Sequence, residues 1–429
     1  MKPFCVSDSS LIVRAADLAP FRRGGRWLIL APRTGASILL EGPRLKLFGA
    51  LARPVSVQKV YELSPDLEED EIQALLGEFH RAGMLQIVGY PLEKSERPEP
   101  RQVHMPRLTL RVTAGCSPSC PKCALQYAEG AALEPAQAID LVEGGLQALA
   151  PGPVCLDLTG AEPLRVPATI EAAIQRAREL RPTVQVAVRT GGYLLDSHLA
   201  GCLERQGACV VLCMHEAPGR AGLEQGPLAD FAAEALRLLP SALATGLSCA
   251  PVGVARRPGQ ALEFFHLFMS MGYRTMRLEF PAPPRQRSDR DQVLDGMAEE
   301  LLAVADAVAR HEERIPVRVR VHPLEEMFSR LASGKARPVC GHPECGARVA
   351  ALERGLERPR DCAEADQAAE TNPRCLRCPF WTLCGGGCRF QRGDHELDLR
   401  CRMWLKAYEG LLWRAHENPD WAGRHWSDF

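Results

Sequence analysis

Between residues 108 and 310 the sequence alternates short apolar, β-branched runs with amphipathic helical segments, and this alternation constrains the fold more than any other feature. The apolar runs predict six strands, at residues 108–113, 154–159, 184–190, 208–215, 245–252 and 275–280. The intervening segments predict helices, at residues 168–180, 196–205, 227–239, 260–271 and 291–310. Six strand–helix units predict an α/β fold, a partial (β/α)6 TIM-like barrel, with its site at the carboxyl ends of the strands.

The rest of the 429 residues divides around this barrel. Residues 1–92 predict a small α+β domain, with strands at 11–14, 27–31 and 37–40 and a helix at 69–81 that Gly83 ends. Residues 93–105 are rich in proline and charge, which is typical of a linker. We expect the barrel to span residues 106–330 and a cysteine-rich domain to span residues 335–429.

The composition excludes some partners and favours metal ligation. The 52 Lys and Arg residues balance 53 Asp and Glu residues, so neither nucleic acid nor an anionic membrane is the expected partner. The sequence has no apolar run long enough to span a bilayer and no secretory signal, so we expect a cytoplasmic protein. Because cytoplasmic thiols stay reduced, the 17 cysteines indicate metal or cluster binding rather than disulfides.

The first cysteine group follows the first predicted barrel strand. Cys116, Cys120 and Cys123 form a C-x3-C-x2-C motif in a loop. Three thiolates can bind three irons of a [4Fe–4S] cluster and leave the fourth iron without a protein ligand. A structural zinc site is the alternative, but it usually needs four ligands.

This motif and its position resemble the radical S-adenosylmethionine (radical SAM) superfamily, over residues 108–280. The resemblance implies that S-adenosylmethionine binds the open iron and yields a 5′-deoxyadenosyl radical. It also implies two cofactor-binding segments. The segment after the second strand lies near the methionine amino group and consists of Gly160, Ala161, Glu162 and Pro163. The turn after the third strand lies near the ribose and contains Thr190 and Gly191. Lys122 stands just before the third cysteine, where the family usually has an aromatic residue near the adenine. Tyr127, slightly downstream, is the candidate to replace that contact.

A second cysteine group lies near the C-terminus and resembles the SPASM extension of peptide-modifying radical SAM enzymes. Its eight thiols match the number that two [4Fe–4S] clusters need, and two zinc sites are the alternative. The resemblance implies an inner auxiliary cluster, on Cys340, Cys345, Cys362 and Cys388, and an outer one, on Cys375, Cys378, Cys384 and Cys401. The expected cofactors are therefore three [4Fe–4S] clusters and S-adenosylmethionine.

The remaining residues of interest have weaker signals. Six further cysteines have the expected role of small hydrophobic residues: Cys5, Cys155, Cys202, Cys209, Cys213 and Cys249. Cys213 and Cys249 lie near predicted strand ends, so an active-site contact is the alternative for these two. His215 and Glu216, which end the fourth predicted strand, are the candidate catalytic or substrate contacts. Four tryptophans near the C-terminus predict a helix anchored to the core: Trp404, Trp413, Trp421 and Trp426.

The N-terminal domain resembles, in size and element order, the winged-helix domains that recognise leader peptides. There the leader adds a strand to a sheet edge, and here that edge is expected at residues 37–40, beside the helix 69–81. The predicted function is therefore modification of a ribosomally synthesised precursor peptide, by thioether or carbon–carbon crosslinking, with flavodoxin or ferredoxin as reductant. The alternatives are oxidation of a protein cysteine or serine, as in anaerobic sulfatase maturation, and a metal-stabilised peptide-binding scaffold.

Overall fold

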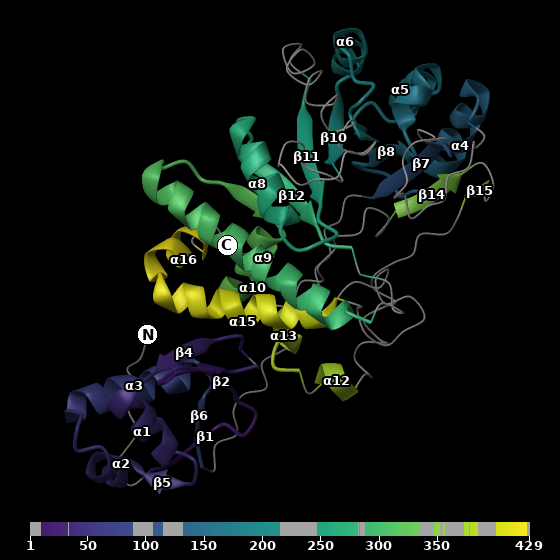
Figure 1. The fold of residues 1–429 in the computed structure, drawn as a ribbon. Coiled ribbons are helices and arrows are strands. Elements are labelled where there is room, and N and C mark those ends of the chain that lie inside the picture. The colour runs from purple at the N-terminus through teal and green to yellow at the C-terminus, as the bar shows by residue number, and fades with distance from the viewer. Residues whose placement is uncertain are drawn as a thin grey trace.

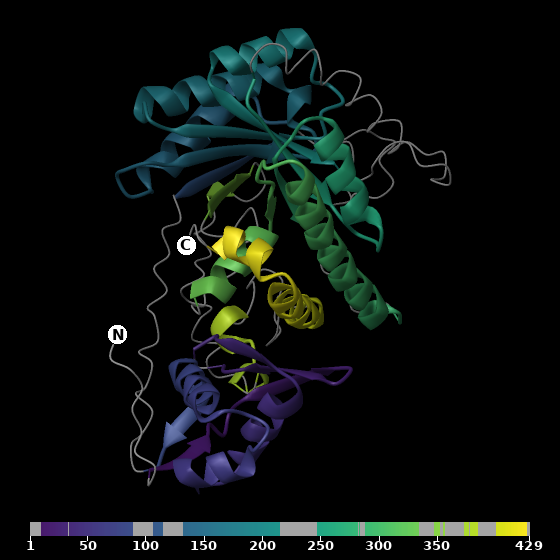
Figure 2. The same ribbon diagram turned by 90° about the vertical axis from the view of Figure 1, so that its left-hand side faces the viewer.

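The computed structural model (Figure 1) describes residues 10–32, 34–88, 106–114, 132–214, 247–281, 283, 288–333, 347–351, 355–356, 373–376, 378–384 and 400–426. These residues form a small N-terminal unit, a large sheet covered by helices, and C-terminal helices between the two (Figure 2). Among the described residues, no helix is long and apolar enough to cross a membrane.

The N-terminal unit contains two three-stranded antiparallel sheets and three helices. The first sheet consists of β5 (Val55–Ser56), β1 (Leu11–Arg14) and β6 (Leu85–Ile87), and the second of β2 (Ala19–Arg23), β3 (Arg26–Leu30) and β4 (Ser37–Leu40). The helices are α1 (Gly42–Ala50), α2 (Val57–Leu63) and α3 (Glu69–Arg81).

Helix α3 has the predicted bounds and the predicted termination. Ile72 and Phe79 lie on its buried face, in the core of the unit. Gly83 has a φ of 71°. Its N–H donates to the His80 carbonyl, and the N–H of Met84 donates to the Phe79 carbonyl. These two bonds are the Schellman arrangement, which needs a left-handed residue at this position.

The sheet β2–β3–β4 connects the N-terminal unit to the rest of the molecule, because its two faces belong to different cores. Ile29 and Ile38 lie in the N-terminal core. Leu28 and Leu30, which alternate with them along β3, lie in the main core together with Trp413 of α15 (Cys401–Glu417). The period of two in a strand therefore places one face of this sheet against the C-terminal helix.

The large sheet has nine strands in the described residues, and seven of them are parallel neighbours in chain order. They are β7 (Arg107–Thr113), β8 (Cys155–Gly160), β9 (Gln185–Thr190), β10 (Ala208–Met214), β11 (Cys249–Val254), β12 (Thr275–Glu279) and β13 (Arg320–His322). The connecting helices are α4 (Pro135–Gln147), α5 (Pro167–Leu180), α6 (Ser197–Arg205), α8 (Gln260–Ser270) and α9 (Arg290–Arg314). The predicted α/β fold with a parallel sheet is confirmed.

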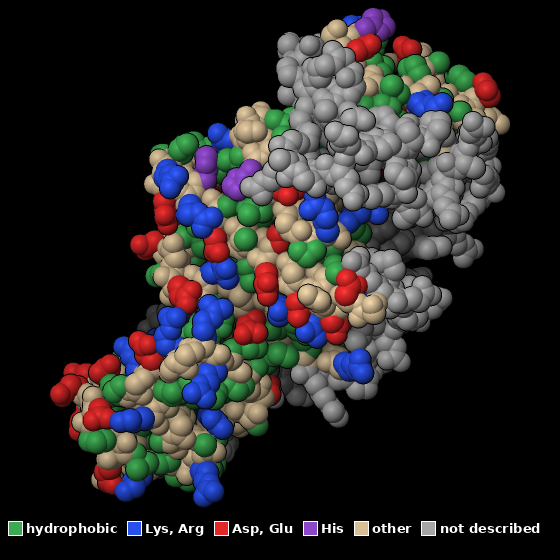
Figure 3. Space-filling model, viewed as in Figure 1, with side chains coloured by type: hydrophobic (Ala, Val, Ile, Leu, Met, Phe, Trp, Pro, Cys, Tyr) green, Lys and Arg blue, Asp and Glu red, His purple; other side chains and the backbone are tan. Residues whose placement is uncertain are grey.

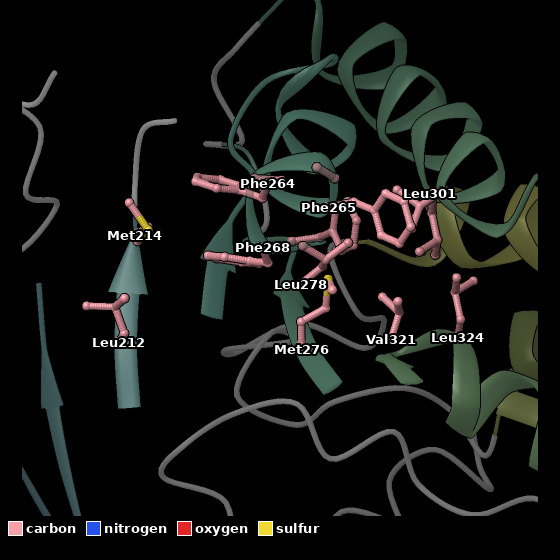
Figure 4. Close-up of a cluster of buried hydrophobic side chains, with 14 of the residues drawn as sticks. Leu212, Met214, Phe264, Phe265, Phe268, Met276, Leu278, Leu301, Val321 and Leu324 are labelled. Carbon is pink, nitrogen blue, oxygen red and sulfur yellow. The ribbon is translucent and has the colours of Figure 1, made fainter. Parts of the chain in front are cut away.

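Alternation along the strands separates an apolar face from a polar one. Leu212 and Met276 lie on the face that packs against the helices, where α8 contributes Phe264, Phe265 and Phe268 (Figure 4). The residues that alternate with these along each strand, such as Cys213 on β10 and Arg277 on β12, lie on the opposite face. In a closed barrel this inner face is usually filled with branched apolar side chains. Here it carries charge.

Two parts of the sheet differ from the prediction of six strands. The short strand β13 is a seventh, and its three residues are too few to give a periodic signal. At the other edge, β14 (Ala347–Ala351) pairs in parallel with β7, and β15 (Gly355–Leu356) pairs antiparallel with β14. Both come from the cysteine-rich region, so long-range pairing rather than local pattern places them. The predicted helix at 227–239 lies outside the described residues.

The C-terminal region contributes α10 (Leu324–Ser333), α12 (Pro373–Leu376), α13 (Trp381–Cys384), α15 and α16 (Pro419–Trp426). Helix α15 packs closely on α9, since a Cβ on Gly410 would come within 2.3 Å of Leu302. Trp404, Trp413 and Trp421 are buried, which confirms that these three anchor the terminal helices.

Candidate active site

The predicted cluster loop begins and ends at the carboxyl end of β7. Cys116, Cys120 and Cys123 themselves lie outside the described residues. The described residues on each side of the loop meet, because Thr113 forms an antiparallel bridge with Ala132 and the N–H of Leu133 donates to the Val112 carbonyl at 2.9 Å. The chain therefore leaves and re-enters the sheet at one point.

Gly160 lies beside that point and has to be glycine. Its φ is 145°, and a Cβ would lie 2.4 Å from the carbonyl oxygen of Thr113. The next N–H, of Ala161, donates to that same oxygen at 3.0 Å. The backbone of β8 thus approaches β7 more closely than any side chain permits.

Glu162 follows this close approach and is 1% exposed. Its Oε1 accepts hydrogen bonds from the Thr190 hydroxyl at 2.6 Å and the Leu164 N–H at 3.1 Å, and its Oε2 accepts one from the Gly191 N–H at 3.0 Å. Burial raises the pKa of this carboxyl group, while the three hydrogen bonds oppose the rise. The sequence analysis placed this segment near the methionine amino group, and the structure adds that three hydrogen bonds from the chain itself hold the Glu162 carboxylate.

Thr190 completes a connection between the ends of β8 and β9. Its side chain is 2% exposed, and its Oγ1 also accepts the N–H of Gly192 at 2.9 Å. A Cβ on Gly191 would lie 3.4 Å from Glu162 Oε2, which is an ordinary contact distance. The predicted cofactor residues therefore form one bonded unit, in which Glu162 shapes the turn. Pro163 begins the short 3-10 helix η1 (Pro163–Arg165) directly after it.

Asp157 and Arg189 form a buried ion pair on the inner face of the sheet. Arg189 Nε lies 3.0 Å from Asp157 Oδ1 and 2.8 Å from Oδ2, and the Asp157 side chain is 1% exposed. Burial alone lowers the pKa of Arg189, but Asp157, Cys213 and Glu279 raise it above its ordinary value. The sequence analysis missed this pair, although charged residues inside otherwise apolar strands were a signal.

Cys213 and the end of β12 continue this polar face. Burial raises the pKa of the Cys213 thiol to about 12, although Arg189 lowers it, so the thiol stays protonated. Arg277 Nε lies 3.0 Å from Glu279 Oε1 in an ion pair on β12. Cys213 therefore lies among charged groups at the end of β10, as the alternative of an active-site contact for this cysteine requires.

His322 extends the polar face to β13. Its Nδ1 lies 3.3 Å from Glu326 Oε1. Burial, followed by the charges of Arg277 and Arg330, lowers the pKa of His322 to about 3, so the ring is neutral. The candidates His215 and Glu216 lie outside the described residues, and His322 is a histidine that the sequence analysis did not identify.

Five of the six cysteines outside the two predicted groups are described, all half-buried: Cys155, Cys202, Cys209, Cys213 and Cys249. Cys249 packs against the apolar core, as predicted for a small hydrophobic residue. Cys5 lies outside the described residues.

The described cysteines of the second group lie on elements that share one core. The N–H of Cys378 donates to the Cys375 carbonyl at 3.0 Å, so these two residues lie in one turn. Cys384 ends α13 and Cys401 begins α15. Within the described ranges, no three His, Cys, Asp or Glu side chains are gathered to hold a metal ion. The thiolate donors fit an iron–sulfur cluster in type. Cys340, Cys345, Cys362 and Cys388 lie outside the described residues.

Comparison with known proteins supports the fold. No protein-family model and no curated protein matches the chain significantly. Among solved structures it is similar to anSMEcpe, a SPASM-type radical SAM sulfatase-maturating enzyme, with AdoMet bound: the TM-score is 0.58 at 15% identity, over 73% of this chain and 99% of that one. The same enzyme with AdoMet and the Cp18Cys peptide gives a TM-score of 0.59 at 15% identity, over 74% and 99%.

A weaker likeness is to Streptococcus suis SuiB bound to S-adenosylmethionine. Its TM-score is 0.47 at 13% identity, over 90% of this chain and 98% of that one. The similarity to anSMEcpe supports the fold that the sequence indicated.

Proposed function

We propose that this chain, which has the fold of a radical SAM enzyme, modifies a peptide by radical chemistry. One observation carries the proposal. The bonded unit of Gly160, Glu162, Thr190 and Gly191 lies at the carboxyl ends of β8 and β9, beside the paired ends of the three-cysteine loop. In barrels of this kind the carboxyl ends of the strands form the active site.

The proposed cofactor residues have distinct tasks. Cys116, Cys120 and Cys123 would hold a [4Fe–4S] cluster with one iron open to S-adenosylmethionine. When bound, this pair supplies a 5′-deoxyadenosyl radical, which abstracts a hydrogen atom from the substrate. Glu162 and Thr190 would hold the β8 and β9 turns in place beside the ligand. The buried carboxylate fixes this geometry before the ligand binds.

The charged inner face supplies the substrate contacts in this proposal. The single N–H of Arg189 Nε is shared between the two carboxylate oxygens of Asp157, which holds the guanidinium group beside β8. A buried, oriented guanidinium recognises a carbonyl or carboxylate group. We therefore assign Arg189 to positioning a polar group of the peptide beside the radical.

The N-terminal unit is the proposed site for the leader of a ribosomally synthesised precursor. Among the described strands β4 pairs only with β3, so its other edge can accept an added strand. The opposite edge, β2, contains Pro20, which lacks the N–H that a further strand needs. On the face of this unit that Figure 3 shows, charges of both signs are mixed, so backbone pairing and apolar contacts favour the leader more than net charge does.

The two auxiliary clusters proposed for the C-terminal cysteines would supply an electron acceptor near the core peptide. Loss of one electron and one proton, as a sulfur or carbon atom adds to the substrate radical, gives a thioether or carbon–carbon crosslink. A flavodoxin or ferredoxin would supply the electron that starts each turnover.

Oxidation of a cysteine or serine in a protein is the second candidate. The similarity to anSMEcpe, which spans 99% of that enzyme, favours it. Altering β4 in the N-terminal unit distinguishes the two candidate functions. A leader-dependent maturase would lose affinity for its precursor peptide, whereas an oxidase of a protein cysteine or serine would keep its affinity for its substrate.

Anaerobic reconstitution tests the proposal. Reduced protein with S-adenosylmethionine is expected to form 5′-deoxyadenosine, and Cys116→Ala should abolish it. Cys202→Ala is the matched control, since Cys202 lies on α6, where Arg205 contacts its sulfur. Zinc in place of iron, or full turnover by Cys116→Ala, would overturn the proposal. Short reading frames beside the gene would supply the precursor for product analysis by mass spectrometry.

A further inference from the structure

His322 and Glu326 form a histidine–carboxylate pair that has no role in the proposed function. His322 is the last residue of β13, and Glu326 lies in the first turn of α10. His322 Nδ1 lies 3.3 Å from Glu326 Oε1, and the two side chains are 24% and 35% exposed. A distance longer than that of a short hydrogen bond is common in a catalytic pair before its substrate binds. The pair is therefore close enough to share a proton and open enough to meet a ligand.

The alternation along β13 places His322 on the inner face of the sheet. Its neighbour Val321 lies in the apolar core on the helix side, with Leu301 and Leu324 (Figure 4). Because successive residues of a strand point to opposite faces, the His322 ring lies on the other side. It is also at the carboxyl end of its strand, and in parallel α/β barrels this end of the strands forms the active site.

The strand register brings His322 into one row with groups of the polar inner face. Pairing runs from Cys213 to Val252, from Val252 to Arg277, and from Arg277 to His322. Arg189, which we assign to the substrate, acts electrostatically on Cys213 at the start of this row. A peptide group held by Arg189 therefore faces the same polar surface as the His322 ring.

The surroundings of the pair disfavour a charged imidazole ring. Burial, together with the charges of Arg277 and Arg330, lowers the pKa of His322 to about 3. Burial raises the pKa of Glu326, although the same two arginines oppose the rise. A proton that reaches the ring is therefore passed to the carboxylate rather than kept on the ring.

Two further titratable groups lie near the pair. Glu279 forms an ion pair with Arg277, at 3.0 Å. The Tyr408 hydroxyl accepts a hydrogen bond from Arg330, and burial raises the pKa of Tyr408 to about 12, so it stays protonated. Glu326 Oε2 is buried and has no hydrogen-bond partner in the described part of the chain. Glu326 is therefore the proton acceptor for the ring.

We propose that His322 and Glu326 form a proton relay that ionises a cysteine thiol of the peptide substrate. The proposal rests on the proposed function and adds the class of substrate. The S–H bond breaks and its proton goes to His322 Nε2, while the ring passes the proton on Nδ1 to Glu326 Oε1. The sulfur keeps the electron pair as a thiolate, so this step needs no oxidant, and Glu326 later releases the proton to water.

A thiol is the substrate group that suits this relay. Its ordinary pKa of about 8.5 lies well below that of a hydroxyl group, so a neutral imidazole ring can take its proton. The charges of Arg277 and Arg330, which disfavour an imidazolium ring, favour a thiolate beside it. The relay therefore favours thioether formation or cysteine oxidation over a carbon–carbon crosslink.

Protection from chemical modification tests the contact between His322 and the peptide. Diethylpyrocarbonate modifies neutral imidazole rings, and mass spectrometry of the full-length reconstituted protein reads each histidine separately. The probe is the precursor peptide encoded beside the gene. At about ten times its Kd this peptide should slow modification of His322 about tenfold, because only free protein reacts. Exposed His198 on α6 should keep its rate.

Equal rates at His322 with and without bound peptide would overturn the proposal. A precursor that is modified without containing any cysteine would overturn it as well.

Two substitutions of similar size test the chemistry, and each keeps the proposal testable if the other does not fold. His322→Gln removes the ring, and Glu326→Gln removes the carboxylate. Each should lower formation of the modified peptide about a hundredfold, while 5′-deoxyadenosine forms at the parent rate. The matched controls are His198→Gln and Glu325→Gln, which breaks an ion pair with Arg318 instead.

A pH profile separates the relay from a structural role. In His322→Gln the thiol has to ionise by itself, so product formation should rise about tenfold per pH unit up to a pH of about 8.5. The parent should change little over the same range. Equal profiles in the two proteins, or an equal loss of 5′-deoxyadenosine and product in His322→Gln, would overturn the proposal. A parent that forms no 5′-deoxyadenosine would instead refute the proposed function, while protection of His322 can still be measured.

Discussion

The Thr190 hydroxyl donates a 2.6 Å hydrogen bond to Glu162 Oε1 and so joins the ends of β8 and β9. Both side chains are at most 2% exposed, and Oε1 also accepts the Leu164 N–H. Two neighbouring turns at the carboxyl edge of the sheet are thereby held in one geometry.

Removing this hydrogen bond should reduce both stability and cofactor binding. Thr190→Val keeps the shape but leaves a buried carboxylate oxygen short of a donor, which costs about 2 kcal/mol of unfolding free energy. Denaturant unfolding measures that cost, and equilibrium dialysis measures the affinity for S-adenosylmethionine. Thr183→Val, in the exposed turn before β9, is the control. An unchanged affinity for S-adenosylmethionine would separate this turn from the cofactor site.

Gly160→Ala should be among the most damaging small substitutions. The added Cβ would lie 2.4 Å from the Thr113 carbonyl oxygen, so β7 and β8 would have to separate next to the cysteine loop. We expect a loss of at least about 2 kcal/mol in unfolding free energy. Gly152→Ala is a matched control, since Gly152 also has a positive φ, of 132°, but nothing lies within 4 Å of its added Cβ. Equal losses in the two variants would assign the effect to backbone conformation rather than to the contact.

Breaking the Asp157–Arg189 pair should destabilise the barrel strongly. Asp157→Asn leaves the half-buried Arg189 charge without its partner, and removing one member of a buried pair costs about 3–5 kcal/mol. The double change Asp157→Asn, Arg189→Met should recover much of that stability, but not substrate turnover. Asp291→Asn, at an exposed ion pair with Arg402, should change little. Full turnover by the double variant would remove Arg189 from the substrate site.

Stability should fall with rising pH through Glu300. This carboxyl group is buried on α9, and burial raises its pKa from 4.5 to about 7. Between these values the unfolded chain has lost the proton and the folded chain keeps it, so the unfolding free energy decreases as pH rises. The decrease is at most about 3 kcal/mol. Glu300→Gln should flatten this slope in urea unfolding between pH 5 and pH 8. A slope equal to that of the parent would show that Glu300 titrates normally.

Leader binding should depend on the free edge of β4. Leu39→Pro removes a backbone donor from β4, whereas Ala19→Pro alters β2, which already contains Pro20. With the precursor peptide and full-length protein, we expect at least about a tenfold loss of affinity in Leu39→Pro alone. Fluorescence anisotropy measures it, with circular dichroism to verify folding. Equal affinity in both variants would place the leader elsewhere.

The alternation of strands and helices determined much of this molecule locally. The bounds of β1, β4 and α3 match their apolar periodicity, because one buried face gives each a repeating pattern. The glycine that ends α3 was also readable, since Gly83 adopts the left-handed conformation that a helix end of this kind needs. The predicted cofactor residues likewise come together at two adjacent strand ends.

Only the tertiary structure decided which distant segments pair in the sheet and which distant side chains contact one another. Strands β13 and β14 are held by pairing with partners far away in the sequence, and the Asp157–Arg189 pair joins neighbouring strands 32 residues apart. The burial of Arg330 is set by α13 and α15, more than 50 residues later. Local pattern reports which face of an element is apolar. It does not report which distant groups share the same low-dielectric space, and that proximity sets the charge, pKa and chemistry of each site.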